Sequence, residues 1–136
     1  MTNSDKKKEV IRSLYAARVA GDIDGTMAAL TDDAIFELNA SGTGLPGMAG
    51  PIEGKPSVRT AIQKFIENFR FSDWKEISLV VDGEKAALHW RALVTFVPNG
   101  KSNAFDVFDF ITFRGDEICD FRQSTDTAKI TSMITG

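Results

Sequence analysis

Three short turn signals divide the second half of the chain into four segments that alternate apolar and polar residues. The segments span residues 74–81, 85–97, 102–113 and 117–124, and the turns between them are Asp82-Gly83, Pro98-Asn99-Gly100 and Arg114-Gly115-Asp116. Turns of this composition join consecutive antiparallel strands. The second half is therefore predicted to be a four-stranded antiparallel meander.

The first half shows the spacing of three and four residues that is typical of amphipathic helices. Ser4 or Asp5 is predicted to cap a helix that ends at Gly21, and Asp22 or Asp24 to cap a shorter second helix. The apolar positions expected on the inner side of the first helix are Val10, Ile11, Leu14, Tyr15 and Val19.

The middle of the chain is predicted to contain a short strand, a long loop and a third helix. The strand spans 34–39, and the glycine-rich segment 40–54 is predicted to be a loop on the rim of a pocket. The third helix begins at Pro56 and runs to Phe69, and a last helical turn or two is expected over 126–133.

This order of elements predicts an α+β fold in one domain, residues 1–136, because helices come first and a meander follows. The N-terminal helices are expected to pack on the concave face of a strongly curved, mostly antiparallel sheet, enclosing an apolar pocket.

Composition excludes several classes of protein. The net charge is −3, and the basic run Lys6-Lys7-Lys8 is too short for a nucleic-acid-binding surface. A single cysteine, Cys119, forms no internal disulfide and no zinc motif, which favours a reducing, cytoplasmic location. No segment has the apolar length of a signal peptide or a membrane span.

Three segments carry a resemblance to a known family. The sequences YAARVAGDIDG from Tyr15, DDAIF from Asp32 and VFDFITFRG from Val107 resemble the SnoaL-like and ketosteroid isomerase-related branch of the NTF2-like superfamily. This resemblance implies a cone-shaped fold with an apolar cavity and a homodimer through the outer face of the sheet.

The catalytic residues of that branch carry over only in part. The resemblance places the catalytic tyrosine at Leu14, one position before Tyr15, and the general base at Leu38, whereas the acid of the oxyanion hole matches Asp109. A second branch, the limonene epoxide hydrolases, would place its arginine and two aspartates at Trp90, Ala92 and Gln123. Neither activity is implied by these matches.

Strand periodicity indicates independently that Asp109 points inward. On the segment 105–113 it shares a face with Phe105, Val107, Ile111 and Phe113. A carboxyl group in such surroundings has a raised pKa and can act as a general acid, a general base or a hydrogen-bond donor. The alternative is a structural ion pair with Arg18 or Arg122.

The remaining candidates are predicted to surround the pocket. Tyr15 is a candidate catalytic donor to a ligand carbonyl, or else a core residue whose hydroxyl bonds to the backbone. Residues expected to contact substrate or to form the pocket wall are Trp90, Gln123, Asn39, Phe36, Leu38, Leu14 and Met48. His89, Phe108 and Phe110 are expected on the outer face, where a second copy would cover them.

The predicted function is the binding of a small apolar carbonyl compound, with proton-transfer chemistry of the isomerase or cyclase type. Polyketide-like and steroid-like rings are the expected ligand class. No metal and no cofactor are expected, because enolisation needs only positioned donors and a base. The alternative is a module without turnover, either a ligand carrier or a protein-association domain.

Overall fold

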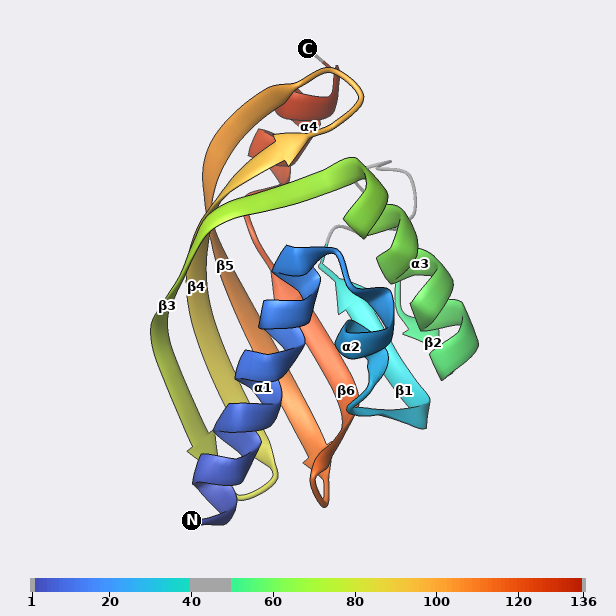
Figure 1. Ribbon diagram of the computed structural model, residues 1–136, viewed down its shortest axis with the longest axis vertical. Coiled ribbons are helices and arrows are strands. Elements are labelled where there is room, and N and C mark those ends of the chain that lie inside the picture. Colours follow the sequence, from blue (N-terminus) through green and yellow to red (C-terminus); the bar gives the residue numbers. More distant parts are fainter. Residues whose placement is uncertain (1, 40–49, 136) are drawn as a thin grey trace.

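The computed structural model describes residues 2–39 and 50–135, and it confirms the α+β fold class (Figure 1). Four helices and six strands follow one another along the described chain. They are α1 (Asn3–Ala20), α2 (Ile23–Met27), β1 (Leu30–Leu38), β2 (Ile52–Glu53), α3 (Lys55–Asn68), β3 (Phe69–Asp82), β4 (Lys85–Phe96), β5 (Lys101–Arg114), β6 (Glu117–Ser124) and α4 (Thr127–Thr135).

The six strands form one sheet in the order β2-β1-β6-β5-β4-β3. All neighbours are antiparallel except β1 and β6, which run parallel, so the meander predicted from the turns is confirmed. The sheet is strongly curved but not closed, and α1, α2 and α3 lie over its concave face (Figure 1). None of the helices in the described part of the chain is long and apolar enough to cross a membrane.

Capping residues place the first two helices. Thr2 caps α1, where its hydroxyl accepts a hydrogen bond from the Asp5 backbone N–H at 3.0 Å, so the predicted cap at Ser4 or Asp5 is wrong. Gly21 ends α1 with a φ of 76°, as predicted. Asp22 rather than Asp24 caps α2, since its carboxylate accepts from the Gly25 N–H at 3.0 Å.

The boundary between α3 and β3 differs from the prediction. The backbone becomes extended at Phe69, whose φ and ψ are −127° and 109°, whereas the sequence suggested a helix through Phe69 and a strand from Trp74. The spacing of Phe69 and Phe71 fits a strand as well as a helix end. Both residues belong to the strand because they pair with Phe96 and Val94 of β4.

Two further predicted boundaries are corrected by pairing. The strand β1 begins at Leu30, four residues before the predicted start, because Leu30 pairs with Ile118 of β6. Within the predicted loop, Ile52 and Glu53 form the short strand β2 against β1. Residues 40–49, which include Met48, lie outside the described residues.

The alternation predicted for β5 is confirmed. Phe105, Val107, Asp109, Ile111 and Phe113 are buried on the concave side, whereas Phe108 and Phe110 are each 52% exposed on the convex side. A β-bulge opposite Thr112 and Phe113 shifts the alternation in β6. Cys119 lies at this bulge, half-buried, so its predicted place on the same face as Phe121 is wrong.

Candidate functional site

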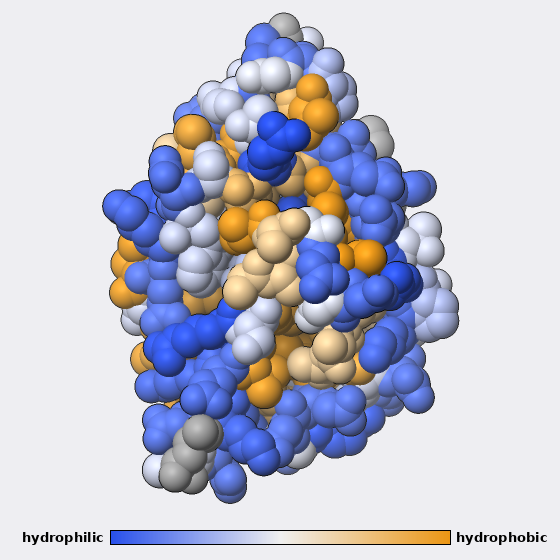
Figure 2. Space-filling model, in the orientation of Figure 1, coloured by the Kyte–Doolittle hydropathy of each residue, from blue (hydrophilic) through white to orange (hydrophobic). Residues whose placement is uncertain are grey.

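An apolar cavity of about 110 Å³ lies between the helices and the concave face of the sheet. Figure 2 shows hydrophobic side chains in the middle of the face that carries α1 and α3, framed by hydrophilic ones. Aromatic rings form much of the wall, and those that contact the cavity include Phe36, Phe65, Phe69, Phe71, Trp90 and Phe121.

Four side chains form a buried hydrogen-bonded cluster at this cavity. The Tyr15 hydroxyl of α1 donates to Asp109 Oδ2 of β5. Trp90 Nε1 of β4 lies 3.0 Å from both the Tyr15 oxygen and Asp109 Oδ2. Gln123 Nε2 of β6 donates to Asp109 Oδ1 at 3.1 Å and to the Tyr15 oxygen at 3.3 Å. Four elements of the fold thus converge on one carboxyl group.

The protonation of the cluster is set chiefly by burial. Asp109 is 3% exposed, and burial raises the pKa of its carboxyl group to about 7, although hydrogen bonds from Tyr15, Gln123 and Trp90 oppose the shift. Burial, together with the charge of Asp109, raises the pKa of Tyr15 well above its usual value. Near neutral pH, Asp109 is therefore populated in both protonation states and Tyr15 stays neutral.

Tyr15 separates Asp109 from the cavity. Tyr15, Trp90 and Gln123 contact the cavity, whereas Asp109 is not among the described residues that line it. The carboxyl group is therefore connected to the cavity through side chains such as Tyr15, to which it is hydrogen-bonded. Of the two neighbouring positions on α1, Tyr15 is the one that contacts Asp109. Leu14, the position given by the resemblance, lines the cavity with an apolar side chain.

The structure brings most of the predicted wall residues to the cavity. Leu14, Phe36 and Leu38 line it, together with Tyr15, Trp90 and Gln123 of the cluster. Asn39 does not join them, because it is exposed at the end of β1, where its backbone N–H donates to the Gln123 carbonyl at 2.7 Å.

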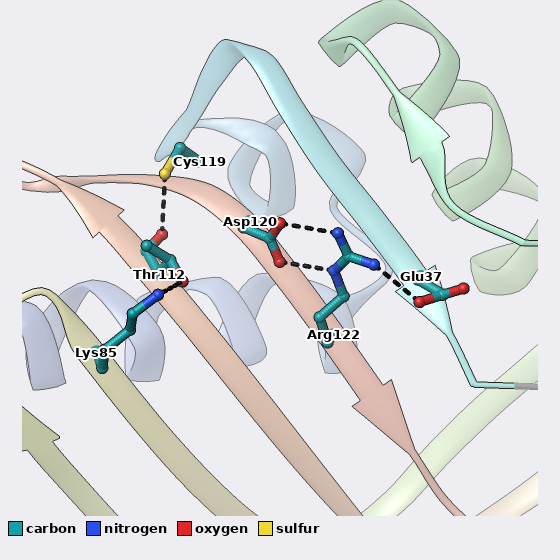
Figure 3. A network of polar contacts seen from close by, with 6 residues as sticks. All are labelled: Glu37, Lys85, Thr112, Cys119, Asp120 and Arg122. Atoms are coloured by element: carbon teal, nitrogen blue, oxygen red, sulfur yellow. Dashed lines mark hydrogen bonds and ion pairs between the residues drawn. The ribbon is translucent and has the colours of Figure 1, made fainter.

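Neither arginine proposed as a partner of Asp109 pairs with it. On the convex face, Arg122 makes two hydrogen bonds to Asp120, at 2.8 and 3.0 Å, and one to Glu37 at 2.9 Å (Figure 3). Arg18 contacts backbone carbonyls instead of a carboxylate. The alternative of an Asp109–arginine ion pair is therefore wrong.

The sequence reasoning missed Trp74 at the site and considered Arg18 only as an ion-pair partner of Asp109. Arg18 lines the cavity from α1, and its spacing from Leu14 and Tyr15 was a usable signal, although Val19 was assigned to the inner stripe and is 38% exposed. Trp74 stacks on the Tyr15 ring with a centroid distance of 5.1 Å, but no hydrogen-bond partner of its buried Nε1 is present among the described residues. The sequence reasoning started the strand at Trp74 instead of Phe69, so it did not indicate the contact of Trp74 with Tyr15.

His89 lies on the convex face, as predicted from its alternation with Trp90. Its ring stacks on Phe108 at 4.3 Å, and its Nε2 lies 2.7 Å from an Asp106 carboxylate oxygen. Across residues 2–39 and 50–135, no group of three or more His, Cys, Asp or Glu side chains is placed to hold a metal ion.

A curved sheet with helices over its concave face, enclosing an apolar cavity with one polar cluster, defines an NTF2-like domain. The sequence profile of the SnoaL-like domain matches residues 11–121, and the chain belongs to this family. Among curated protein sequences, none matches the chain.

Solved structures with low sequence identity share the fold. A candidate isomerase from Bacillus subtilis is 17% identical with a TM-score of 0.88, covering 100% of this chain and 97% of its own. A candidate SnoaL-like polyketide cyclase from Jannaschia sp. CCS1 is 14% identical with a TM-score of 0.84, with 100% and 96% covered. An LEH-like epoxide hydrolase from M. tuberculosis is 18% identical with a TM-score of 0.76, with 99% and 94% covered.

Proposed function

We propose that this protein binds a small cyclic carbonyl compound in the cavity and catalyses proton transfer on it through Tyr15 and Asp109, without a cofactor. The observation that carries the proposal is the hydrogen bond from Tyr15 to a buried Asp109 at the wall of an otherwise apolar cavity. Solved relatives described as an isomerase and a polyketide cyclase support the same reaction class.

The pair acts as a proton relay. When Asp109 is ionised, the Tyr15 oxygen accepts a proton from the carbon beside the ligand carbonyl, while the Tyr15 proton passes to Asp109 Oδ2. The reverse movement returns a proton to another carbon of the enolate, which completes an isomerisation. Tyr15 never becomes a free phenolate in this scheme, in agreement with its raised pKa.

This relay replaces the general base that the resemblance placed at Leu38. Leu38 is an apolar wall residue here, and no Asp or Glu is among the described residues that line the cavity. With a pKa of about 7, Asp109 is populated in both protonation states near neutral pH, as a group that alternates between base and acid requires.

The cavity size favours a ligand of about one ring. A protein cavity of roughly 150 Å³ accommodates benzene, and this cavity is about 110 Å³. The steroid-like rings suggested by the sequence are therefore less suitable than a monocyclic ketone. The apolar wall supplies binding energy, and Gln123 and Trp90 hold the Tyr15 oxygen in position.

The test is the isomerisation of 3-cyclohexenone to the conjugated 2-cyclohexenone, followed by ultraviolet absorbance. Tyr15→Phe and Asp109→Asn are each expected to lower kcat by about 10²–10⁴-fold, the usual contribution of a general acid or base. His89→Gln, which changes an ionisable group on the convex face, is the matched control and should leave the rate unchanged. Unchanged rates in both cluster variants would reject the relay.

A ligand carrier is the second candidate, favoured by the complete hydrogen bonding of the cluster. In a carrier, the wild-type protein would bind 2-cyclohexenone without isomerising its precursor, and Asp109→Asn would keep the affinity within a few fold. A protein-association module would bind neither compound. These results separate the three classes with one set of variants.

We also propose a homodimer through the convex face. Two rows cross this face through neighbouring strands. One row is formed by Val80, Ala87, Phe110 and Arg122, and the other by Ser78, His89, Phe108 and Ser124. Exposed aromatic rings at the centre of a sheet face are suited to burial by a second copy. A cytoplasmic location stays a prediction from the cysteine content.

A further inference from the structure

Arg18 places a cation in the wall of the apolar cavity. It projects from α1 one turn after Tyr15, is 7% exposed and contacts the cavity. Its Nη2 donates to the backbone carbonyls of Phe65 at 3.3 Å and Phe69 at 3.0 Å, and its guanidinium lies 3.9 Å from the centre of the Phe71 ring.

No carboxylate of the described chain balances this charge. Five other arginines form ion pairs with Asp or Glu side chains, namely Arg12, Arg59, Arg91, Arg114 and Arg122. Arg18 forms none within residues 2–39 and 50–135, and residues 40–49 contain no Asp or Glu in their sequence. Burial lowers the pKa of Arg18 to about 10, so the side chain remains a cation at neutral pH.

A buried cation without a counterion is unfavourable, and its placement therefore needs a reason. A guanidinium carries five N–H donors in a planar fork that matches a carboxylate. Only Nη2 has an acceptor among the described residues, so Nε and Nη1 retain N–H groups for a ligand.

We propose that Arg18 binds a carboxylate group of the ligand, so that the substrates are small cyclic carbonyl compounds that also carry a carboxylate. This inference rests on the proposed use of the cavity as a ligand site. Tyr15 then contacts the carbon beside the carbonyl, and Arg18 holds the acidic end of the same molecule. Both side chains come from one face of α1, three residues apart.

The experiment compares benzoate with benzamide, which has the same ring and a neutral amide, by isothermal titration calorimetry at pH 6. Wild-type protein is expected to bind benzoate at least about tenfold more tightly, because charge-assisted hydrogen bonds are about twice as strong as neutral ones. Arg18→Met should reduce this preference to within about twofold while keeping the affinity for benzamide. Arg18→Gln, which keeps a donor for the two carbonyls, should do the same if the methionine variant does not fold.

Arg12→Gln is the matched control, because Arg12 lies on the outside of the same helix, where it pairs with Glu76 at 2.8 Å. It should keep the wild-type preference. Equal wild-type affinity for the two compounds, or a preference that survives the loss of Arg18, would overturn the inference.

Failure of the proposed reaction gives a different result. Tyr15→Phe should lose isomerisation and retain the benzoate preference. A wild-type protein that prefers benzoate but isomerises neither 3-cyclohexenone nor a carboxylate-bearing derivative of it would reject the relay alone. If neither benzoate nor benzamide binds, the inference falls together with the ligand cavity.

Discussion

Strand β5 carries two aspartates three residues apart, and its two faces treat them in opposite ways. Asp106 on the convex face receives hydrogen bonds from His89 and Arg91, which lower the pKa of its carboxyl group. Asp109 on the concave face is buried among neutral donors, and burial raises its pKa to about 7. The same residue type is thus a solvated ion-pair partner on one side of the sheet and a buried carboxyl group with a raised pKa on the other.

The concave face therefore combines core packing with a buried hydrogen-bonded cluster, whereas the convex face distributes charge over exposed pairs. Removing a side chain from the concave face should therefore affect stability and protonation strongly. Removing a side chain from the convex face should weaken association of two copies, or should change the free energy of unfolding very little. Four predictions test this division.

The largest expected effect is on packing, and two phenylalanines of β5 form a matched pair. Phe113 is 1% exposed on the concave face, so Phe113→Ala should lower the free energy of unfolding by about 3–5 kcal/mol. Phe110 is half exposed, and Phe110→Ala should lower it by less than about 1 kcal/mol. Urea denaturation at low protein concentration measures both, and equal losses would contradict the division of the two faces.

The second prediction concerns the pH dependence of stability. Between about pH 4 and pH 7 the unfolded state releases the Asp109 proton and the folded state keeps it, so the free energy of unfolding falls as pH rises across this window. The expected contribution is about 4 kcal/mol, from a pKa of about 7 in the folded state and a reference value of 3.8. Asp109→Asn should remove this decrease, which denaturation curves at pH 4 to 8 measure.

Asp106→Asn is the control for that measurement, because the contribution of Asp106 to stability depends on pH with the opposite sign. The pKa of Asp106 is lower in the folded state than in the unfolded state, so this group stabilises the folded state at pH values above its unfolded pKa. This contribution is lost as pH falls below about 4. An Asp106→Asn variant that abolished the Asp109-dependent decrease in stability between pH 5 and 7 would show that the two faces are electrostatically coupled.

The third prediction tests association through the convex face. The double substitution Phe108→Asp and Phe110→Asp places charges at the centre of the proposed interface and should weaken a dimer at least about hundredfold, as for central interface residues. Sedimentation velocity over a concentration series measures the change. Lys64→Glu on α3 is the control, and a wild-type protein that remains monomeric throughout the series would reject the homodimer.

The smallest effect is expected from a convex ion pair. Arg91→Gln removes the contact with Asp106, whose nitrogen–oxygen distance is 3.0 Å, and should change the free energy of unfolding by about 0–1 kcal/mol. Thermal unfolding at low and high salt measures it. A larger loss, or one that persists at high salt, would mean that this pair is structurally important.

Much of the fold and part of the site could be predicted from the sequence, because alternation along a strand specifies which side chains share a face. That rule placed Asp109 and Trp90 inside and His89 and Phe108 outside, and the structure confirms all four positions. The rule failed at Cys119, because a β-bulge inserts an extra residue into β6 and the sequence pattern does not predict the bulge.

The polar contacts of the site could not be predicted in the same way. Periodicity gives faces and not distances, so the meeting of Tyr15 with Asp109, and the absence of an ion pair with Arg18, required the structure. The parallel pairing of β1 with β6 joins residues far apart in the chain, which a local pattern does not report.

The position of Tyr15 and Arg18 on one helix has a consequence for ligand selectivity. Since α-helical residues rise about 1.5 Å each, the two points of attachment are offset by about 4.5 Å along the axis of α1. No loop movement alters this offset, so in the proposed ligand site it sets the separation between the two polar groups that a ligand must have.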